Sequence, residues 1–221
     1  MRRPPTDDVI SVRLRFVVIG TVLVASAVLL GILIGFEGAP PGIDLWADAR
    51  VDALGPVLRG LSLGMDIVGA GWFAVLIVPV GTAAVLLALR RPWAAVLFLV
   101  GLGTSALAVQ VLKSAFDRAR PEGMLVLSDA GSYPSGHVAN AATVAVLAVI
   151  IFPRAWVAVA GTGWVMLMGL SRMNLHAHWF SDTVGGALVG VGVALMVAAA
   201  FAPPLMRERP ARLPPRLPEL S

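Results

Sequence analysis

The sequence contains no cysteine, one lysine, one tyrosine and three histidines among its 221 residues. Without cysteine the chain has no disulfide, no thiolate nucleophile and no cysteine-based metal site. Charge is also scarce: charged residues make up 14% of the chain, whereas a soluble globular domain has about a quarter. Hydrophobic residues make up 58% and the mean hydropathy is +0.86. These values exclude an ordinary soluble domain and indicate a protein embedded in a bilayer.

Six stretches lack Asp, Glu, Lys and Arg over about the length that a transmembrane helix needs. They cover residues 16–36, 67–89, 92–112, 138–153, 155–171 and 183–206. We therefore expect an all-α polytopic membrane protein with six transmembrane helices in one bundle. The first stretch is longer than the apolar region of a signal peptide, so we expect it to be retained as an anchor.

The segments outside these stretches suggest a simple domain organisation. We expect an N-terminal cytoplasmic segment over 1–15, the membrane domain over 16–202 and a disordered Pro/Arg-rich cytoplasmic tail over 203–221. The first outer loop, residues 37–66, mixes apolar and charged residues. It is consistent either with a short helix lying in the membrane surface or with an irregular loop packed on the bundle. The Gly186-x-x-x-Gly190 spacing predicts close helix packing.

The basic residues predict the orientation of the bundle. If six spans place both termini on one side, that side holds eleven of the basic residues and the other side holds six. The two groups are Arg2, Arg3, Arg13, Arg15, Arg90, Arg91, Arg154, Arg207, Arg209, Arg212 and Arg216, and Arg50, Arg59, Lys113, Arg118, Arg120 and Arg172. This asymmetry predicts cytoplasmic termini. Although the pI is about 10.9, no basic stripe interleaved with aromatics occurs, so we expect membrane lipids and not nucleic acid as partners. The sequence does not predict an oligomeric state.

The scarce polar residue types gather in two loops on the predicted outer face. At the end of the third span, Lys113 and Arg120 are seven residues apart, nearly two helical turns, and share a face if the helix continues. The Lys113 ammonium is a compact charge, and the Arg120 guanidinium can donate two parallel hydrogen bonds. Together on one face they could bind a phosphate. The alternative is that both side chains merely reach towards the head groups.

The segment Tyr133-Pro-Ser135-Gly136-His137 precedes the fourth span. The free N–H groups and positive dipole end of the following helix would bind an anion. The Ser135 hydroxyl would add a hydrogen bond, and His137 could exchange a proton at the same oxygens. The plainer interpretation is a helix-capping serine beside an unrelated histidine.

A third segment, between the fifth and sixth spans, carries Ser171, Arg172, His176, His178 and Asp182. On a helix, the carboxylate of Asp182 could accept a hydrogen bond from His178 and leave the other ring nitrogen as a nucleophile. Arg172 supplies a further cation. His176 lies off that face and is expected at the interface or near the substrate.

A metal site is the competing interpretation of this His and carboxylate cluster. Zinc would require three or four such ligands. Because three cations surround the histidines, we favour an anion site and expect neither a metal nor a cofactor.

Together the three segments resemble the signature of the type-2 phosphatidic acid phosphatase superfamily: Lys-x6-Arg-Pro, Pro-Ser-Gly-His and Ser-Arg-x5-His-x3-Asp. The resemblance implies a metal-independent phosphatase. It implies that His178 attacks phosphorus, Asp182 orients it, and His137 protonates the leaving oxygen and then activates water. The phosphoryl oxygens would be held by a set of five residues: Lys113, Arg120, Ser135, Gly136 and Arg172.

This resemblance implies a lipid phosphatase, expected in the bacterial plasma membrane with its active site facing outwards. The substrate we favour is a polyprenyl diphosphate such as undecaprenyl diphosphate, with phosphatidylglycerophosphate or phosphatidic acid as the alternative. Glu122 and Tyr133 are the candidates for specificity in the short loop 121–133. Two other functions remain open: a non-catalytic lipid-phosphate binding or transport protein, and a phosphotransferase.

Overall fold

The computed structural model describes residues 6–36, 39–69, 71–127 and 131–208. Over these residues the chain is helical and contains no strand, which confirms the all-α class. The elements are α1 (Thr6–Phe36), α2 (Gly42–Asp52), α3 (Gly55–Gly69), the π-helix η1 (Phe73–Ile77), α4 (Val78–Ala88), α5 (Pro92–Phe116), α6 (Gly136–Ile151), α7 (Ala155–Asn174) and α8 (Phe180–Glu208).

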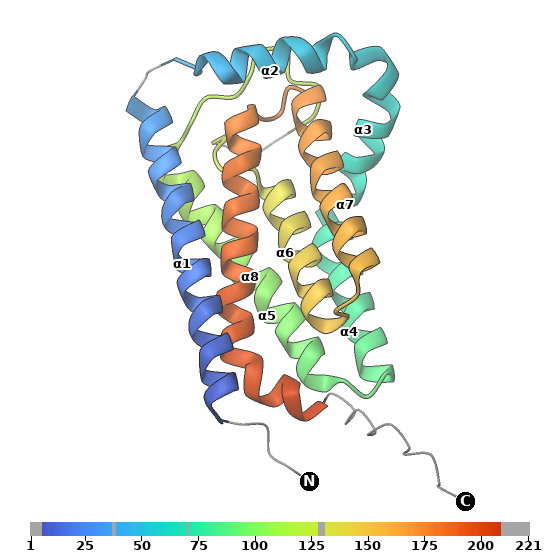
Figure 1. Ribbon diagram of the computed structural model, residues 1–221. Helices are drawn as coiled ribbons and strands as arrows, with labels where there is room; N and C mark the ends of the chain where they lie inside the picture. The colour runs from blue at the N-terminus through green and yellow to red at the C-terminus, as the bar shows by residue number, and fades with distance from the viewer. Residues whose placement is uncertain (1–5, 37–38, 70, 128–130, 209–221) are drawn as a thin grey trace, which may run out of the picture.

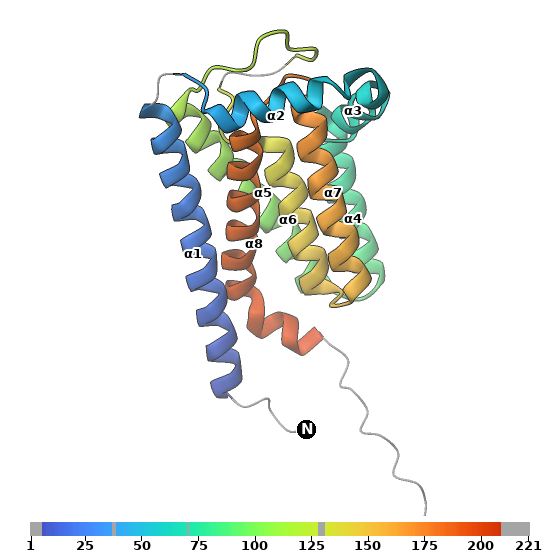
Figure 2. The same cartoon turned by 45° about the horizontal axis from the view of Figure 1, so that its top comes forward.

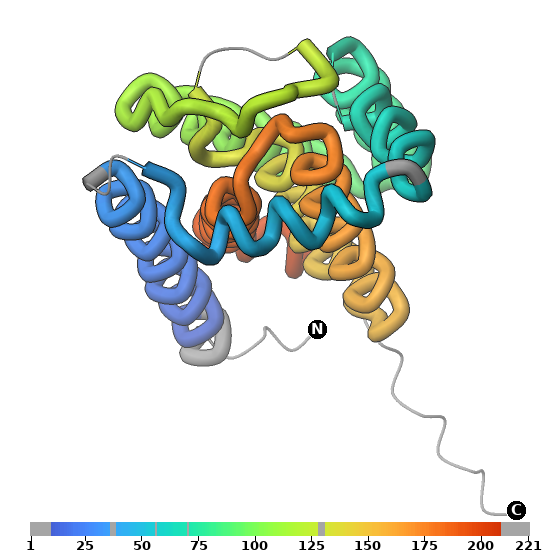
Figure 3. The backbone as a smooth tube through the Cα atoms, turned by 90° about the horizontal axis from the view of Figure 1, so that it is seen from above, coloured from blue at the N-terminus to red at the C-terminus, as the bar shows by residue number. Residues whose placement is uncertain are grey.

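The long helices form one bundle in which α8 packs against α1, α5, α6 and α7 (Figure 1). At one end of this bundle α2 runs crosswise from α1 to α3, over the ends of α7 and α8 (Figure 3). The segment that connects α5 to α6 rises at the same end (Figure 2). We call this the α2 end. The opposite end holds the start of α1, the end of α8, and the turns that connect α4 to α5 and α6 to α7.

Small residues allow α8 to approach α6 closely. A Cβ atom added at Gly186 would collide with the carbonyl oxygen of Ser135, and one added at Gly190 would collide with the carbonyl oxygen of Ala139. The predicted close packing at this glycine pair is therefore confirmed. It places the first turn of α6 directly against the first turns of α8, where the candidate site lies.

Three helices are long and apolar enough to cross a membrane: Ile10–Gly35, Pro92–Phe116 and Phe180–Glu208. The pair Val57–Gly69 and Phe73–Ala88 would be a fourth span, bent by 50°. Helix α6 is apolar but has 16 residues, short of the roughly 20 that a full crossing needs. The described helices thus establish a protein with several membrane spans, and the six predicted from the sequence are not confirmed.

The second predicted span, residues 67–89, is not one continuous helix. Helix α3 ends at Gly69, and Gly71 has a φ of +53°, a left-handed conformation that favours glycine. The chain then resumes as η1 and α4. The apolar composition is the same on both sides of the break, so hydropathy alone predicted a single segment.

The predicted domain boundaries also differ from the helix ends. Helix α1 begins at Thr6, within the predicted N-terminal segment, and α8 continues through Pro203 and Pro204 to Glu208. The Glu208 carboxylate accepts hydrogen bonds from backbone N–H groups at the start of α5, where it complements the helix dipole. Residues 209–221 of the predicted tail lie outside the described residues.

The first outer loop is helical over 42–52 and 55–69, and not irregular, while a position in the membrane surface stays a prediction. It forms α2 and α3. The buried side chains of α2 are Asp44, Ala47 and Val51, which share one helical face towards the bundle. The exposed side chains beside them include Ile43, Leu45 and Trp46.

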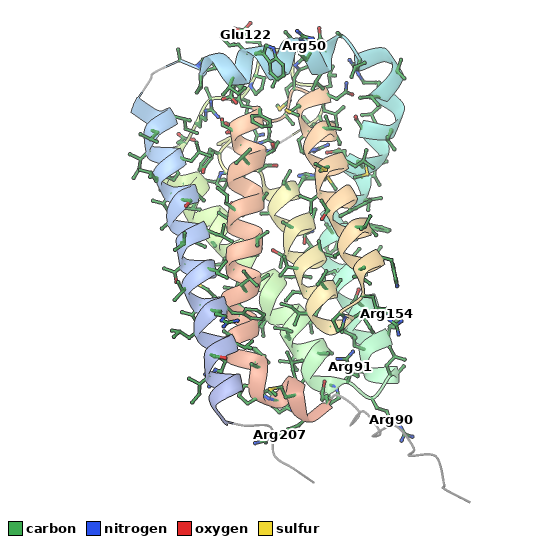
Figure 4. All side chains as sticks on the ribbon, in the orientation of Figure 1. Arg50, Arg90, Arg91, Glu122, Arg154 and Arg207 are labelled. Carbon is green, nitrogen blue, oxygen red and sulfur yellow. The ribbon has the colours of Figure 1, made fainter. Side chains whose placement is uncertain are left out.

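Figure 4 labels arginines at both ends of the bundle. Arg90, Arg91, Arg154 and Arg207 lie at the opposite end, whereas Arg50 lies at the α2 end.

Candidate active site

His178 lies between α7 and α8 at the α2 end. Its side chain is 3% exposed and lines a cavity of about 580 Å³ together with Lys113, Gly136 and His137. Its Nδ1 atom is 2.7 Å from the backbone carbonyl oxygen of Ser132. Because a carbonyl oxygen only accepts, Nδ1 carries the proton and Nε2 keeps its lone pair. Burial lowers the pKa of His178 below its usual 6.5, so the ring is neutral at pH 7.

Asp182 lies beside this ring as an ion-pair partner, but it is not the acceptor of the ring's hydrogen bond. Its Oδ2 atom is 3.7 Å from Nδ1 of His178, too long for a hydrogen bond. That oxygen instead accepts from the backbone N–H of Trp179 at 2.8 Å. Helix α8 begins at Phe180, so His178 precedes it and the four-residue spacing does not place both side chains on one helical face. The Ser132 carbonyl orients the ring, and Asp182 fixes the segment that carries it.

Two residues that sequence reasoning missed join α2 to this segment. Arg118 donates to Oδ1 of Asp182 at 2.6 Å and to Oδ2 of Asp44 at 2.7 Å. Asp44 is fully buried and also accepts from the backbone N–H and the hydroxyl of Ser181, at 2.8 and 2.7 Å. A buried Asp–Arg–Asp chain therefore ties the crosswise helix α2 to the start of α8. No spacing in the sequence signals this pairing.

His137, in the first turn of α6, contacts a second ion pair, of which the arginine is buried. Arg172 is 1% exposed and donates to Oδ1 of Asp66, on α3, at 2.6 Å. The same Nη1 atom is 3.2 Å from Nε2 of His137. Because a guanidinium only donates, Nε2 of His137 is the acceptor and this ring is also neutral. Arg172 thus lies beside His137, as expected, while Asp66 balances its charge.

Lys113 and Arg120 converge, although not by the predicted route. Helix α5 ends at Phe116, and Asp117 has a φ of +38°, so the helix does not continue to Arg120. The chain turns back instead, and Nζ of Lys113 and Nη2 of Arg120 both donate to the carbonyl oxygen of Gly131, at 2.7 and 2.8 Å. Two cations on one oxygen are the arrangement that an anionic oxygen also requires.

Ser135 and Gly136 form the N-terminus of α6. The backbone N–H of Ser135 donates to the carbonyl oxygen of Asp182 at 3.0 Å. The Ser135 hydroxyl makes no capping bond and is buried without a hydrogen-bond partner in the described part of the chain. Capping therefore does not explain this serine, whereas a phosphoryl oxygen would supply the missing partner.

A second cavity, of about 610 Å³, contains Glu122 and Tyr133, the two residues that were expected to set specificity. Glu122, Tyr133, His176 and Arg120 line it, whereas they do not line the cavity of His178. The hydroxyl of the buried Tyr133 donates to a backbone carbonyl of α1. His176 lies 3.2 Å from Asp48 on α2. These contacts give Tyr133 and His176 structural roles. Among the described residues, no three His, Asp or Glu side chains gather as a set of metal ligands.

Comparison with known proteins identifies the class. The sequence model of the PAP2 superfamily matches residues 94–203, which include all three motifs. Phosphatidylglycerophosphatase B of Bacillus subtilis is 32% identical over 153 residues, which cover 64% of this chain and 74% of that protein. The chain belongs to the PAP2 superfamily, and it is a membrane lipid phosphatase of that family.

The solved structures agree with this assignment. The crystal structure of a transmembrane PAP2 type phosphatidylglycerolphosphate phosphatase from Bacillus subtilis matches with a TM-score of 0.70 and 27% identity, over 86% of this chain and 98% of that one. Aquifex aeolicus LpxE matches in fold, with a TM-score of 0.58 and 21% identity. The lipid A 1-phosphatase of Porphyromonas gingivalis is 35% identical over 105 residues, 46% of this chain and 23% of that protein.

Proposed function

We propose that the protein hydrolyses the terminal phosphate of a membrane lipid through a phosphohistidine at Nε2 of His178. The observation that carries this proposal is the 2.7 Å hydrogen bond from Nδ1 to the Ser132 carbonyl, because it leaves Nε2 with a lone pair in the cavity. A neutral, oriented imidazole is the form of histidine that attacks phosphorus.

In the first step, Nε2 of His178 attacks phosphorus, and the bond between phosphorus and the lipid oxygen breaks. His137 gives that oxygen its proton. For this, His137 must be protonated, so substrate binding must draw Arg172 from Nε2 of His137 to the phosphoryl oxygens. The 3.2 Å contact between these two side chains is the one that changes.

In the second step, water attacks the phosphohistidine, and His137 removes its proton. The bond between phosphorus and nitrogen breaks and inorganic phosphate leaves. Throughout, the charge on the phosphoryl oxygens would be stabilised by the cations of Lys113, Arg120 and Arg172, the hydroxyl of Ser135 and the N–H of Gly136. Asp182 acts through the segment that positions His178.

Two substrates have separate support. Phosphatidylglycerophosphate is supported by the names of a relative and a solved structure. A polyprenyl diphosphate is supported by the compact chain and by the charge count of the sequence, which predicts that the site faces away from the cytoplasm.

Phosphate release from a lipid panel tests the proposed reaction. Purified protein in detergent with EDTA is given phosphatidylglycerophosphate, phosphatidic acid and undecaprenyl diphosphate. We expect release by the natural protein and by His176→Ala, a matched control two residues from the nucleophile, and none by His178→Ala. Equal activity in the two variants, or loss of release with EDTA, would refute the mechanism.

The orientation is tested with single cysteines, because the natural chain has none. Arg50→Cys lies at the α2 end and Arg154→Cys at the opposite end, and both positions are exposed. A membrane-impermeant maleimide added to intact bacterial spheroplasts should label the first and not the second. The reverse pattern would place the site in the cytoplasm.

A further inference from the structure

Apart from Ser105, whose hydroxyl accepts a hydrogen bond from Thr143, the cavity of His178 is lined by two polar side chains that the proposed reaction does not use. They are Gln110 on α5 and Asn140 on α6, and both line the cavity with Lys113, His137 and His178. Their other neighbours in the lining are mostly apolar or small, such as Leu102 and Val109. The cavity therefore has a charged end, a neutral polar zone and an apolar remainder.

Helix direction places each carboxamide further from the α2 end than the site residue on the same helix. Helix α5 runs towards the α2 end, so Gln110 lies one turn below Lys113. Helix α6 runs away from that end, so Asn140 lies one turn below His137. Three residues of helix correspond to about 4.5 Å. Gln110 is therefore about one helical turn further into the bundle than Lys113, and Asn140 is about one turn further in than His137.

Neither carboxamide makes a side-chain hydrogen bond with any residue in the described ranges. Gln110 is exposed and Asn140 is half-buried, and both lie within apolar helices. Polar groups without partners are costly where water is scarce, and in membrane proteins they usually find a hydrogen-bond partner. Two such groups facing one cavity are the pattern of a ligand-binding zone.

We propose that Gln110 and Asn140 bind neutral oxygens of the glycerol part of the lipid and so select glycerol-derived phosphate monoesters. This inference rests on the proposed function. In such lipids a hydroxyl or an ester carbonyl lies a few bonds from the reacting phosphorus, and a carboxamide can donate to either and accept from a hydroxyl.

A prenyl diphosphate fits this zone less well. Its second phosphate would bring negative charge, followed directly by hydrocarbon. Lys113 is the one Lys or Arg among the described residues that line this cavity, and the proposed reaction engages it, with Arg120 and Arg172, at the reacting phosphate. A charged phosphate binds best to a cationic group. Neutral amide groups are better hydrogen-bond partners for neutral oxygens.

A matched pair of substrates tests the selection. Lysophosphatidic acid and hexadecyl phosphate are both single-chain phosphate monoesters, but the second lacks the glycerol oxygens. The variants Gln110→Leu and Asn140→Leu remove the carboxamides at similar volume. Thr104→Val is the control, since Thr104 is exposed on α5 and does not line the cavity.

We expect each cavity variant to lower kcat/KM for lysophosphatidic acid about fivefold, the value of one hydrogen bond. The kcat/KM for hexadecyl phosphate should stay within about twofold of that of the natural protein, and the control should change neither. Equal losses on both substrates, no loss on either, or a natural protein that prefers hexadecyl phosphate or undecaprenyl diphosphate would overturn the inference. Those results would leave the phosphatase reaction in place, whereas no release from any lipid would refute the reaction and the inference together.

Discussion

Among the Asp-to-Asn substitutions on α2, Asp44→Asn should destabilise the protein most. Asp44 is fully buried and accepts three hydrogen bonds, from Nη2 of Arg118 and from the N–H and hydroxyl of Ser181. An amide retains one acceptor oxygen and turns an NH₂ group towards one of these donors. Breaking a buried charge pair costs about 3–5 kcal/mol. Because Arg118 keeps its ion pair with Asp182 in this variant, we expect a loss of stability at the lower end of this range, about 3 kcal/mol.

The assay is unfolding in mixed detergent micelles, with Asp48→Asn as the matched control. Asp48 lies on the same helix, but its side chain is 30% exposed and its partner is His176 at 3.2 Å. Partly exposed pairs contribute about 0–1 kcal/mol. The kcat of Asp44→Asn should also fall, because the start of α8 carries the segment of His178. If both variants lost the same stability, the Asp–Arg–Asp chain would have no special role.

Three further predictions concern the catalytic chemistry and the packing of the site. The acid limb of kcat/KM should lie below pH 6.5, because the neutral ring of His178 is the active form and burial lowers its pKa; a limb above pH 6.5 would contradict this. Ser135→Ala should lower kcat/KM about fivefold without reducing the melting temperature, since its hydroxyl has no partner in the described structure to lose; a large drop in melting temperature would show a structural role instead. Gly190→Ala should cost about 1–3 kcal/mol of stability by collision with Ala139, while Gly163→Ala, which has open space, should cost nothing; equal effects would disprove the close contact.

The motifs could be predicted from sequence because their residue types are scarce. One lysine and three histidines within a chain that is 14% charged draw attention to the segments that hold them. Apolar composition likewise predicted a helical membrane protein. It could not show that the helix breaks at Gly71, since a left-handed residue changes the backbone and not the hydropathy.

The supporting contacts could not be predicted because they join segments far apart in the chain. Asp66 reaches Arg172 from another helix, and the ring of His178 is oriented by a backbone carbonyl, a group that every residue has. The expected pairing of His178 with Asp182 assumed one continuous helix. Helix α8 begins at Phe180, after the histidine, and so the assumption fails.

Rapid-quench trapping of the covalent intermediate tests the central claim most directly. Lipid labelled with ³²P in its terminal phosphate is mixed with the natural protein, and turnover is stopped with alkali, in which phosphohistidine survives. The account predicts label on the peptide that contains His178, formed before inorganic phosphate and absent from His178→Ala. Continued turnover with no label on any histidine would contradict it.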